Sequence, residues 1–404
     1  MEEKLISQKK PFFPIISELT AYLKQYNRWV FTPIFYEDLL LFFFSLVVYD
    51  ENEQDTLWVR VYYTDSERND IDYNLKKIYA LLHSDGNESS IPYLNVDAID
   101  YCTFGNSKPF RIKIRNILND NFTYFYVKRT DASRVYGLEF EHMLSPHNLN
   151  FLVNDTTLIE EHIAGIPGDV FIQEFLGECS PAQQAQIAKE YVKFNERCMI
   201  RLLGDMRAYN YVVVPTHDFD QVVYKIRAID FDQQCYEGKF KVYRPQFFKE
   251  NFPMVEIVKD KLTLNSVNQY KIEERSIVAR RIISSGARLQ NLVTIMKQDD
   301  LTRTDYLKNL SEEIFKFTKD DAFLGVKNVG EVMEASFDYV RRHYENLNII
   351  LPNHVQLQDC ISDCWLMNKA NFLKQNPDQH ACTQYMTSMF VDWTDFSVVS
   401  YECI

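Results

Sequence analysis

The 404-residue chain lacks any long apolar segment. Its most apolar run, 39–49, is far too short to span a bilayer, which takes about 20 such residues. A basic region followed by an apolar stretch, the pattern of a secretory signal, is also missing from the N-terminus. We therefore expect a cytoplasmic protein without a membrane partner.

Clusters of positive charge are missing as well. The chain has 44 Lys and Arg against 57 Asp and Glu, a formal net charge of −13. Nucleic-acid binding needs clustered cations that neutralise phosphates, so the net charge argues against a nucleic-acid partner, and a cationic or neutral partner fits better. Internal repeats and low-complexity segments are not evident. The 46% of hydrophobic residues can build a large core, so nothing suggests disorder.

Paired cysteine motifs are scarce among the eight cysteines. Only Cys360 and Cys364 are close, with three residues between them. Together with His354 and His380 they allow interpretation as a zinc site, but no second paired motif supports it. Buried thiols in a reducing compartment are the simpler interpretation.

Hydrophobic periodicity divides the chain into three units. Residues 1–90 read as an α+β extension, with helices at 15–26 and 70–82 and strands at 40–48 and 57–63. Residues 91–165 are mostly strands. The elements expected there are strands at 110–114, 122–128, 149–153 and 157–163 and a helix at 131–144.

From 166 to 404 the pattern is helical. Ser180 is a good N-cap and is followed by proline at the first helical position, so a long helix should begin there. Further helices are expected at 272–296, 306–317 and 329–347.

Three polar residues follow that first long helix, in a loop before the apolar strand 211–214. Asp205 suits a group that holds an acceptor hydroxyl and takes its proton, and Asn210 suits a neutral ligand of Mg²⁺. Arg207 lies between them and could neutralise the γ-phosphoryl oxygens as charge spreads in the transition state. Alone, this spacing is also typical of a solvated loop that caps a helix.

A second acidic motif supports the functional interpretation of the first. The apolar strand 226–229 runs into Asp230-Phe231-Asp232, and a hairpin connection is expected at 215–221. A carboxylate at the end of a buried strand is where a metal ligand belongs, and an unpaired one there would be expensive. The order of helix, loop, strand, hairpin, strand and acidic pair is more specific than either motif.

These motifs resemble those of the protein-kinase-like superfamily, in particular its atypical bacterial branch of small-molecule and aminoglycoside phosphotransferases. The resemblance covers about residues 95–235. It implies a two-lobed α+β fold, with a β-rich N-lobe at 91–165 and a helical C-lobe at 166–404. It also implies ATP and Mg²⁺ as cofactors, Asp205 as the catalytic aspartate, Asn210 and Asp230 as metal ligands, and Asp232 as a further ligand or a solvated side chain.

The resemblance further assigns the nucleotide-binding residues. Lys128 matches the strand lysine that holds the α- and β-phosphates, with Glu139 on the next helix as its first-choice partner and Glu141 as the rival. The segment 158–165 is similar to the hinge that meets adenine, where Glu161 and Ile163 flank the contact. Gly105 stands in the only candidate for a phosphate-covering loop, although an ordinary turn fits that segment as well.

Departures from the family pattern narrow the expected function. Gly204 replaces the usual residues before the aspartate, Asp232 replaces a glycine, and no A-P-E motif follows. We therefore expect an ATP- and Mg²⁺-dependent phosphotransferase that acts on a hydroxyl of a small molecule or a protein. Two alternatives stay open: a nucleotide-binding scaffold without turnover, whose partner binds residues 1–90, and an enzyme that transfers AMP. Acidic residues such as Asp169 and Glu237 favour a cationic acceptor, unless they belong to a solvated face.

Overall fold

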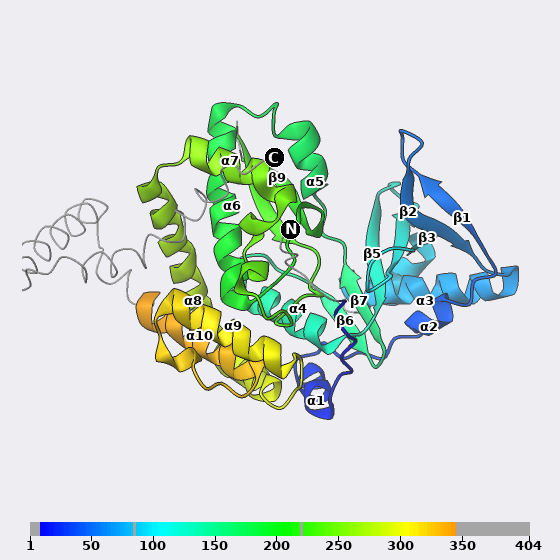
Figure 1. The fold of residues 1–404 in the computed structure, drawn as a ribbon. Helices are drawn as coiled ribbons and strands as arrows, with labels where there is room; N and C mark the ends of the chain where they lie inside the picture. Colours follow the sequence, from blue (N-terminus) through cyan, green and yellow to red (C-terminus); the bar gives the residue numbers. More distant parts are fainter. Residues whose placement is uncertain (1–8, 84–85, 219–220, 345–404) are drawn as a thin grey trace, which may run out of the picture.

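The computed structural model describes residues 9–83, 86–218 and 221–344. Over these residues the chain is α+β, with antiparallel strands in the N-terminal part and mostly helices in the C-terminal part (Figure 1). The candidate zinc ligands lie outside the described residues, namely His354, Cys360, Cys364 and His380. No helix among the described residues combines the length and apolar character needed to cross a membrane.

The N-terminal part is built on one antiparallel sheet of seven strands. The order across the sheet is β1-β2-β3-β4-β5-β7-β6. The strands are β1 (Phe44–Tyr49), β2 (Asp55–Tyr62), β3 (Leu94–Cys102), β4 (Phe110–Asn116), β5 (Phe122–Arg129), β6 (Phe151–Asn154) and β7 (Thr157–Glu161). In β4 the buried Phe110, Ile112 and Ile114 alternate with half-exposed residues, which is the period of a strand with one buried face.

The first 90 residues are not a separate extension, contrary to the sequence-based prediction. β2 pairs with β3, so β1 and β2 continue the same sheet, and α3 (Asp65–His83) contacts β3 and β4. Further upstream, Lys10 forms an ion pair of 2.6 Å with Asp131, which caps α4 (Ala132–Leu144). Continuing a sheet satisfies backbone groups that an isolated unit would leave at an edge, which is why the expected boundary at residue 90 is not structural.

The C-terminal part is a set of helices around a small sheet. The helices are α5 (Gly168–Val170), α6 (Pro181–Arg201), α7 (Phe252–Lys261), α8 (Leu264–Met296), α9 (Thr304–Thr318) and α10 (Val329–Tyr344). The strands are β8 (Ile166–Pro167), β9 (Tyr211–Asp218) and β10 (Gln221–Ala228), in the order β10-β9-β8. The hairpin connection expected at 215–221 is therefore shorter than predicted, since Pro215 lies within β9 and pairs with Tyr224.

α6 begins where the sequence indicates. The Ser180 side chain accepts a hydrogen bond from the Gln183 backbone, and the Gln183 side chain accepts one from the Ser180 backbone, which completes a capping box with Pro181 at the first position. α6 ends at Arg201, and its C-cap, Leu202, adopts a left-handed conformation with φ of 51°. This left-handed residue turns the chain out of the helix and into the loop that carries Asp205.

Two hydrophobic cores hold the molecule together. One lies between the sheet and α3, and the other fills the helical part and extends into α4, β6 and α1 (Ser17–Gln25). α4 contacts α8, and Figure 1 shows α4 between the sheet and the large helices. α4 is thus one of the elements that join the two parts, together with α1, which also contacts α8.

Candidate functional site

The loop after α6 is fixed by two other segments. The Gly204 N–H donates to the Gln233 carbonyl at 3.1 Å, and the Asp205 N–H donates to the Val242 carbonyl at 3.2 Å. A Cβ at Gly204 would lie 3.0 Å from that Gln233 oxygen, so the glycine allows this close approach. Asp205 itself has φ of 58°, a left-handed conformation that is uncommon for aspartate and frequent at functional sites.

The side chains of this loop form one connected group. Asn210 donates its Nδ2–H to the Asp205 carbonyl at 2.7 Å, which leaves the Asn210 Oδ1 as its acceptor. Arg207 donates to Asp205 Oδ1 at 2.8 Å and to Glu250 at 2.7 Å, and its guanidinium stacks over the Phe248 ring. The three residues singled out in the sequence are therefore held by each other.

Asp205 has an altered protonation equilibrium. Burial raises its pKa to about 6, and although the bond from Arg207 opposes this, the charges of Asp230 and Glu250 raise it further. An aspartate with this pKa is ionised at neutral pH, yet it is a stronger proton acceptor than an ordinary carboxylate.

Asp230 and Asp232 follow β10, as expected, and they are bridged by an arginine that the sequence did not single out. Arg134 in the first turn of α4 binds Asp230 at 2.8 Å and Asp232 at 2.9 Å through Nη2. Its Nη1 lies 3.3 Å from Glu160 on β7. The Arg134 side chain is 1% exposed, so its positive charge is shielded from solvent and interacts with the three carboxylates.

Arg134 also sets the charge state of Asp232. Burial opposes ionisation of Asp232, but the positive charges of Arg134 and Lys10 outweigh it and lower its pKa. Asp232 is buried and paired, so the alternative that it is a solvated side chain is wrong. Whether it also contacts a metal ion stays a prediction.

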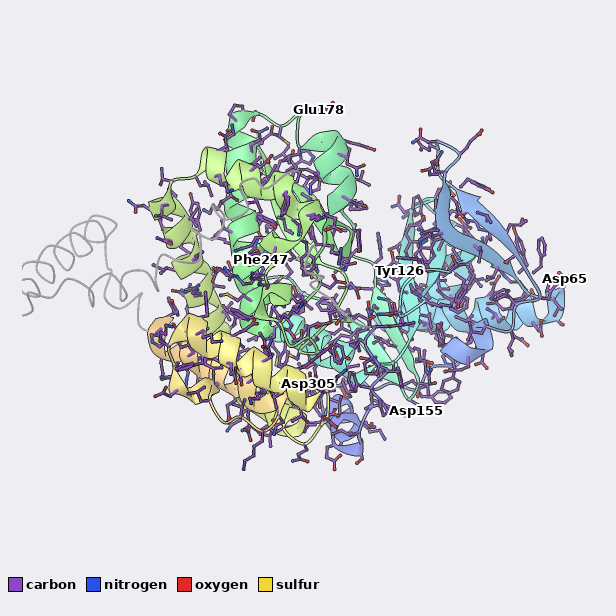
Figure 2. The ribbon with its side chains drawn as sticks, in the orientation of Figure 1. Asp65, Tyr126, Asp155, Glu178, Phe247 and Asp305 are labelled. Atoms are coloured by element: carbon purple, nitrogen blue, oxygen red, sulfur yellow. The ribbon has the colours of Figure 1, made fainter. Side chains whose placement is uncertain are left out.

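Lys128 lies on β5, and Figure 2 shows Tyr126 of the same strand at the boundary between the sheet and the helical part. The predicted partner of Lys128 is wrong. Its ammonium group binds Glu160 at 2.6 Å, and neither Glu139 nor Glu141 contacts it. β5 pairs with β7 so that Lys128 stands opposite Leu158, which brings Glu160 onto the same face of the neighbouring strand.

The two rival glutamates of α4 have other partners. Glu139 accepts hydrogen bonds from Tyr22 at 2.7 Å, Arg28 at 3.2 Å and Arg288 at 2.8 Å. Glu141 is paired with Arg201 of α6. Both glutamates therefore pair with arginines of the N-terminal segment and the helical part rather than with Lys128, and they tie α4 to its surroundings.

Burial also changes the pKa of Lys128. Burial and the charge of Arg134 lower the pKa of Lys128, and the charges of Glu160 and Asp230 oppose that change only in part. Ion pairs run from Lys128 to Glu160, from Glu160 to Arg134 and from Arg134 to Asp230. These ion pairs connect the sheet to the end of β10.

The hinge-like segment follows β7. Glu161 uses its backbone N–H to donate to the Asn150 carbonyl, and its carboxylate accepts from the Asn150 N–H at 2.8 Å. Ile163 is buried, and among the described residues its backbone N–H and carbonyl have no hydrogen-bond partner. Ile163 is thus better suited than Glu161 to offer backbone groups to a ligand edge.

Gly105 lies in the turn between β3 and β4, with φ of +83° and open space around it. The neighbouring Phe104 is exposed, and Thr103 ties the turn to Leu57 of β2. This is a glycine required by turn geometry. Its role in a phosphate-covering loop stays a prediction, because an ordinary turn accounts for the same geometry.

Glu237 is a further acidic group near Asp205. It is 2% exposed, and its Oε1 has no hydrogen-bond partner among the described residues. Burial raises its pKa to about 7, and repulsion by Asp205 adds to the effect. The Asp169 Oδ1 is likewise buried without a partner in the described part of the chain. Both residues are those that the sequence suggested for a cationic acceptor, and that suggestion stays open.

The donor set is compatible with Mg²⁺ but is not a complete metal site. No group of three or more His, Cys, Asp or Glu side chains in the described part of the chain is arranged to hold a metal ion. Asn210 Oδ1 and one oxygen of Asp230 stay available as oxygen donors, because Asp230 Oδ1 accepts from Arg134. Mg²⁺ is commonly held by one or two such groups, with phosphate oxygens and water as the remaining ligands.

Sequence reasoning missed Arg134, Glu160 and Glu250. One signal for Arg134 was present, because an arginine in the first turn of a helix is unfavourable to the helix dipole and so indicates a specific acidic partner. For Glu160 and Glu250 the sequence carries no such signal, since both depend on contacts between distant segments.

Comparison with protein-family models finds no match to the chain, and comparison with curated proteins finds none either.

Proposed function

We propose that the chain is an ATP-dependent phosphotransferase with Mg²⁺ as cofactor, built on a two-lobed protein-kinase-like plan. The observation that carries the proposal is the convergence of three segments. Arg134 binds both Asp230 and Glu160, and Glu160 binds Lys128 at 2.6 Å. The Ile229 N–H, just before Asp230, donates to the Asn210 carbonyl of the Asp205 loop at 3.0 Å. The strand order β3-β4-β5-β7-β6, with α4 between β5 and β6 in the chain, is also consistent with such an N-lobe. The free thiols of Cys102, Cys179, Cys198 and Cys235 accord with a reducing cytoplasm.

In the proposed reaction the oxygen of an acceptor hydroxyl attacks the γ-phosphorus of ATP. The bond from that phosphorus to the β,γ-bridging oxygen breaks, ADP leaves with the electron pair, and the hydroxyl proton passes to Asp205. Lys128 would hold the nonreacting phosphates, while Arg207 would balance charge on the transferred group. Magnesium, held by Asn210 and Asp230, would neutralise phosphate charge. Ile163 would present its free backbone groups to the adenine edge.

Two other functions use the same residues. An AMP-transferring enzyme would need the nucleotide and metal groups equally but would break the bond between the α- and β-phosphates. A scaffold would bind nucleotide without turnover. The raised pKa of Asp205 favours turnover, because groups that accept protons in catalysis often have pKa values shifted toward neutral pH.

Labelled nucleotides test the proposal. The purified chain is incubated with Mg²⁺ and with either γ- or α-labelled ATP, with water and small hydroxyl compounds as acceptors. Release or transfer of the γ-label alone is the expected result. Transfer of the α-label would show AMP transfer, and binding of ATP with no release of either label would show a scaffold.

The reaction should depend on pH through Asp205. Because its pKa is about 6, we expect kcat/KM for ATP turnover to be level above pH 7 and to fall about tenfold for each pH unit below 6, as the base becomes protonated. Initial rates between about pH 4.5 and 8.5 would measure this. The Glu250→Gln variant should move the fall to lower pH, because the Glu250 charge helps to raise the pKa. A profile that stays level down to the acid end of this range would argue against Asp205 as the base.

The two aspartates after β10 should differ in their effect on metal binding. We expect Asp230→Asn to weaken binding of Mn²⁺ in the presence of an ATP analogue at least about tenfold, as loss of a metal ligand does. Asp232→Asn should change it less than about threefold, because the Asp232 side chain is only 11% exposed, against 34% for Asp230, and is less accessible to a metal ion. Titration of Mn²⁺ followed by electron paramagnetic resonance measures this affinity without turnover. Equal losses in both variants would make Asp232 a ligand, as the sequence suggested.

A further inference from the structure

β1 is the edge strand of the seven-stranded sheet, and its outer edge has no strand partner among the described residues. Figure 1 shows it at the outermost margin, away from the helical part. An edge strand presents a row of unpaired N–H and carbonyl groups that can pair with another strand. Proteins usually protect such edges with lysine, proline or a covering element, yet the segment 39–49 contains no charged residue and no proline.

Large apolar side chains are exposed along this strand and just before it. The exposed fractions are 71% for Leu41, 69% for Phe43, 50% for Phe44 and Leu46, 42% for Val47 and 61% for Tyr49. Scattered single apolar residues on a surface are ordinary, but a contiguous set on an unpaired edge indicates an interaction surface. We call residues 41–49 the edge-strand surface.

Acidic residues at both ends of the edge-strand surface indicate which kind of partner would bind there. Glu37 and Asp38 precede it, and Asp50, Glu51, Glu53 and Asp55 follow it. Lys and Arg are absent from 37–59, and the next cation, Arg60, is already paired with Asp100 at 3.0 Å. The surface is therefore apolar in the middle and negative at both ends.

We propose that the edge-strand surface binds an extended segment of a partner protein that is apolar in its middle and carries Lys or Arg at both ends. The segment would add to the sheet as an eighth strand, with backbone hydrogen bonds along β1 and its basic ends beside the two acidic clusters. This proposal does not depend on phosphotransfer, because β1 lies at the opposite margin of the sheet from β6 and β7.

Charge also argues against two other occupants. A second copy of the chain, paired antiparallel through β1, would bring the acidic start of one strand beside the acidic end of the other, and like charges there repel. An anionic membrane surface would be repelled by the same six carboxylates.

A peptide-binding experiment tests this. The full chain is titrated against a fluorescent peptide of alternating Val and Thr with two Lys at each end, and against matched peptides with Glu ends or with a central Pro. We expect the Lys-ended peptide to bind at least about tenfold more tightly than either control, a difference of about 1.4 kcal/mol. Leu46→Lys should weaken binding by about tenfold or more, whereas Leu264→Lys on α8, where the leucine is 46% exposed, should leave it unchanged.

A charge reversal makes the test specific. The double variant Glu51→Lys/Glu53→Lys should bind the Lys-ended peptide more weakly and the Glu-ended peptide more tightly than the wild type does. Thermal unfolding of each variant checks that the fold is kept. Equal binding of the Pro peptide, or no binding at millimolar peptide, would overturn the proposal. So would dimers that Leu46→Lys disperses in sedimentation, or binding to phosphatidylserine vesicles that the same variant abolishes, because these would identify a second copy or a membrane as the occupant.

Discussion

Replacing Asp205 with asparagine is expected to lower γ-phosphoryl transfer by about 10²- to 10⁴-fold, because a positioned general base contributes about this much to a rate. The amide keeps the shape of the side chain but cannot take the hydroxyl proton. The backbone carbonyl of residue 205, which accepts the Asn210 amide, is unchanged, so the loop should keep its structure. Steady-state turnover of ATP and nucleotide affinity would both be measured.

The affinity measurement decides how the Asp205→Asn result is interpreted. We expect nucleotide binding within about threefold of the wild type, since Lys128 and Asp230 are intact and a change below about 1 kcal/mol is expected for a group that acts in the chemical step. Glu250→Gln serves as the matched control, because it removes a carboxylate from the same cluster but leaves the proposed base. If wild type and Asp205→Asn bind ATP equally and neither turns it over, the chain is a scaffold.

Replacing Glu139 with alanine is expected to lower the free energy of unfolding by about 3–5 kcal/mol, the usual effect of removing one partner from a buried charge group. Glu139 is fully buried and holds Arg28, Arg288 and Tyr22, so its loss leaves two arginines without their shared anion. Denaturation in urea would give the free energy. Nucleotide affinity of the folded variant should be unchanged, because Lys128 is held elsewhere.

Glu160→Gln is the matched comparison for Glu139→Ala. Its carboxylate holds both Lys128 and Arg134. This variant should therefore lower the affinity for nucleotide by about tenfold, the typical effect of a charged hydrogen bond at a site. The opposite pattern, with ATP affinity lost in Glu139→Ala and kept in Glu160→Gln, would restore the pairing that the sequence suggested.

Local patterns in the sequence located many elements of the fold, although β3 and α7 were not predicted. The start of α6 was predicted from Ser180 and Pro181, and the strand at 110–114, which is β4, from its periodicity, since these signals involve residues a few positions apart. The loop at Asp205 and the end of β10 at Asp230 were also located correctly. The division of the chain at residue 90 was not, because pairing between β2 and β3 joins segments whose connection spans α3.

The partners of the charged residues could not be predicted. α4 is buried on nearly every side, so its sequence does not reveal which glutamate contacts Lys128, and in fact neither does. Lys128 meets Glu160 only because β7, not β6, lies next to β5. Arg134 reaches Asp230, which is 96 positions away in the chain.

By itself, the sequence determined which polar residues stand at the ends of helices and strands, because helix caps, turns and side-chain periodicity are set by near neighbours. Only the tertiary structure decided that Arg207 joins Asp205 to Glu250, that Arg134 binds the acidic pair, and that Glu139 pairs with Arg28 and Arg288. The physical reason is that burial and charge act through space. They depend on which segments pack together, and that is fixed by strand order and helix packing across the whole chain.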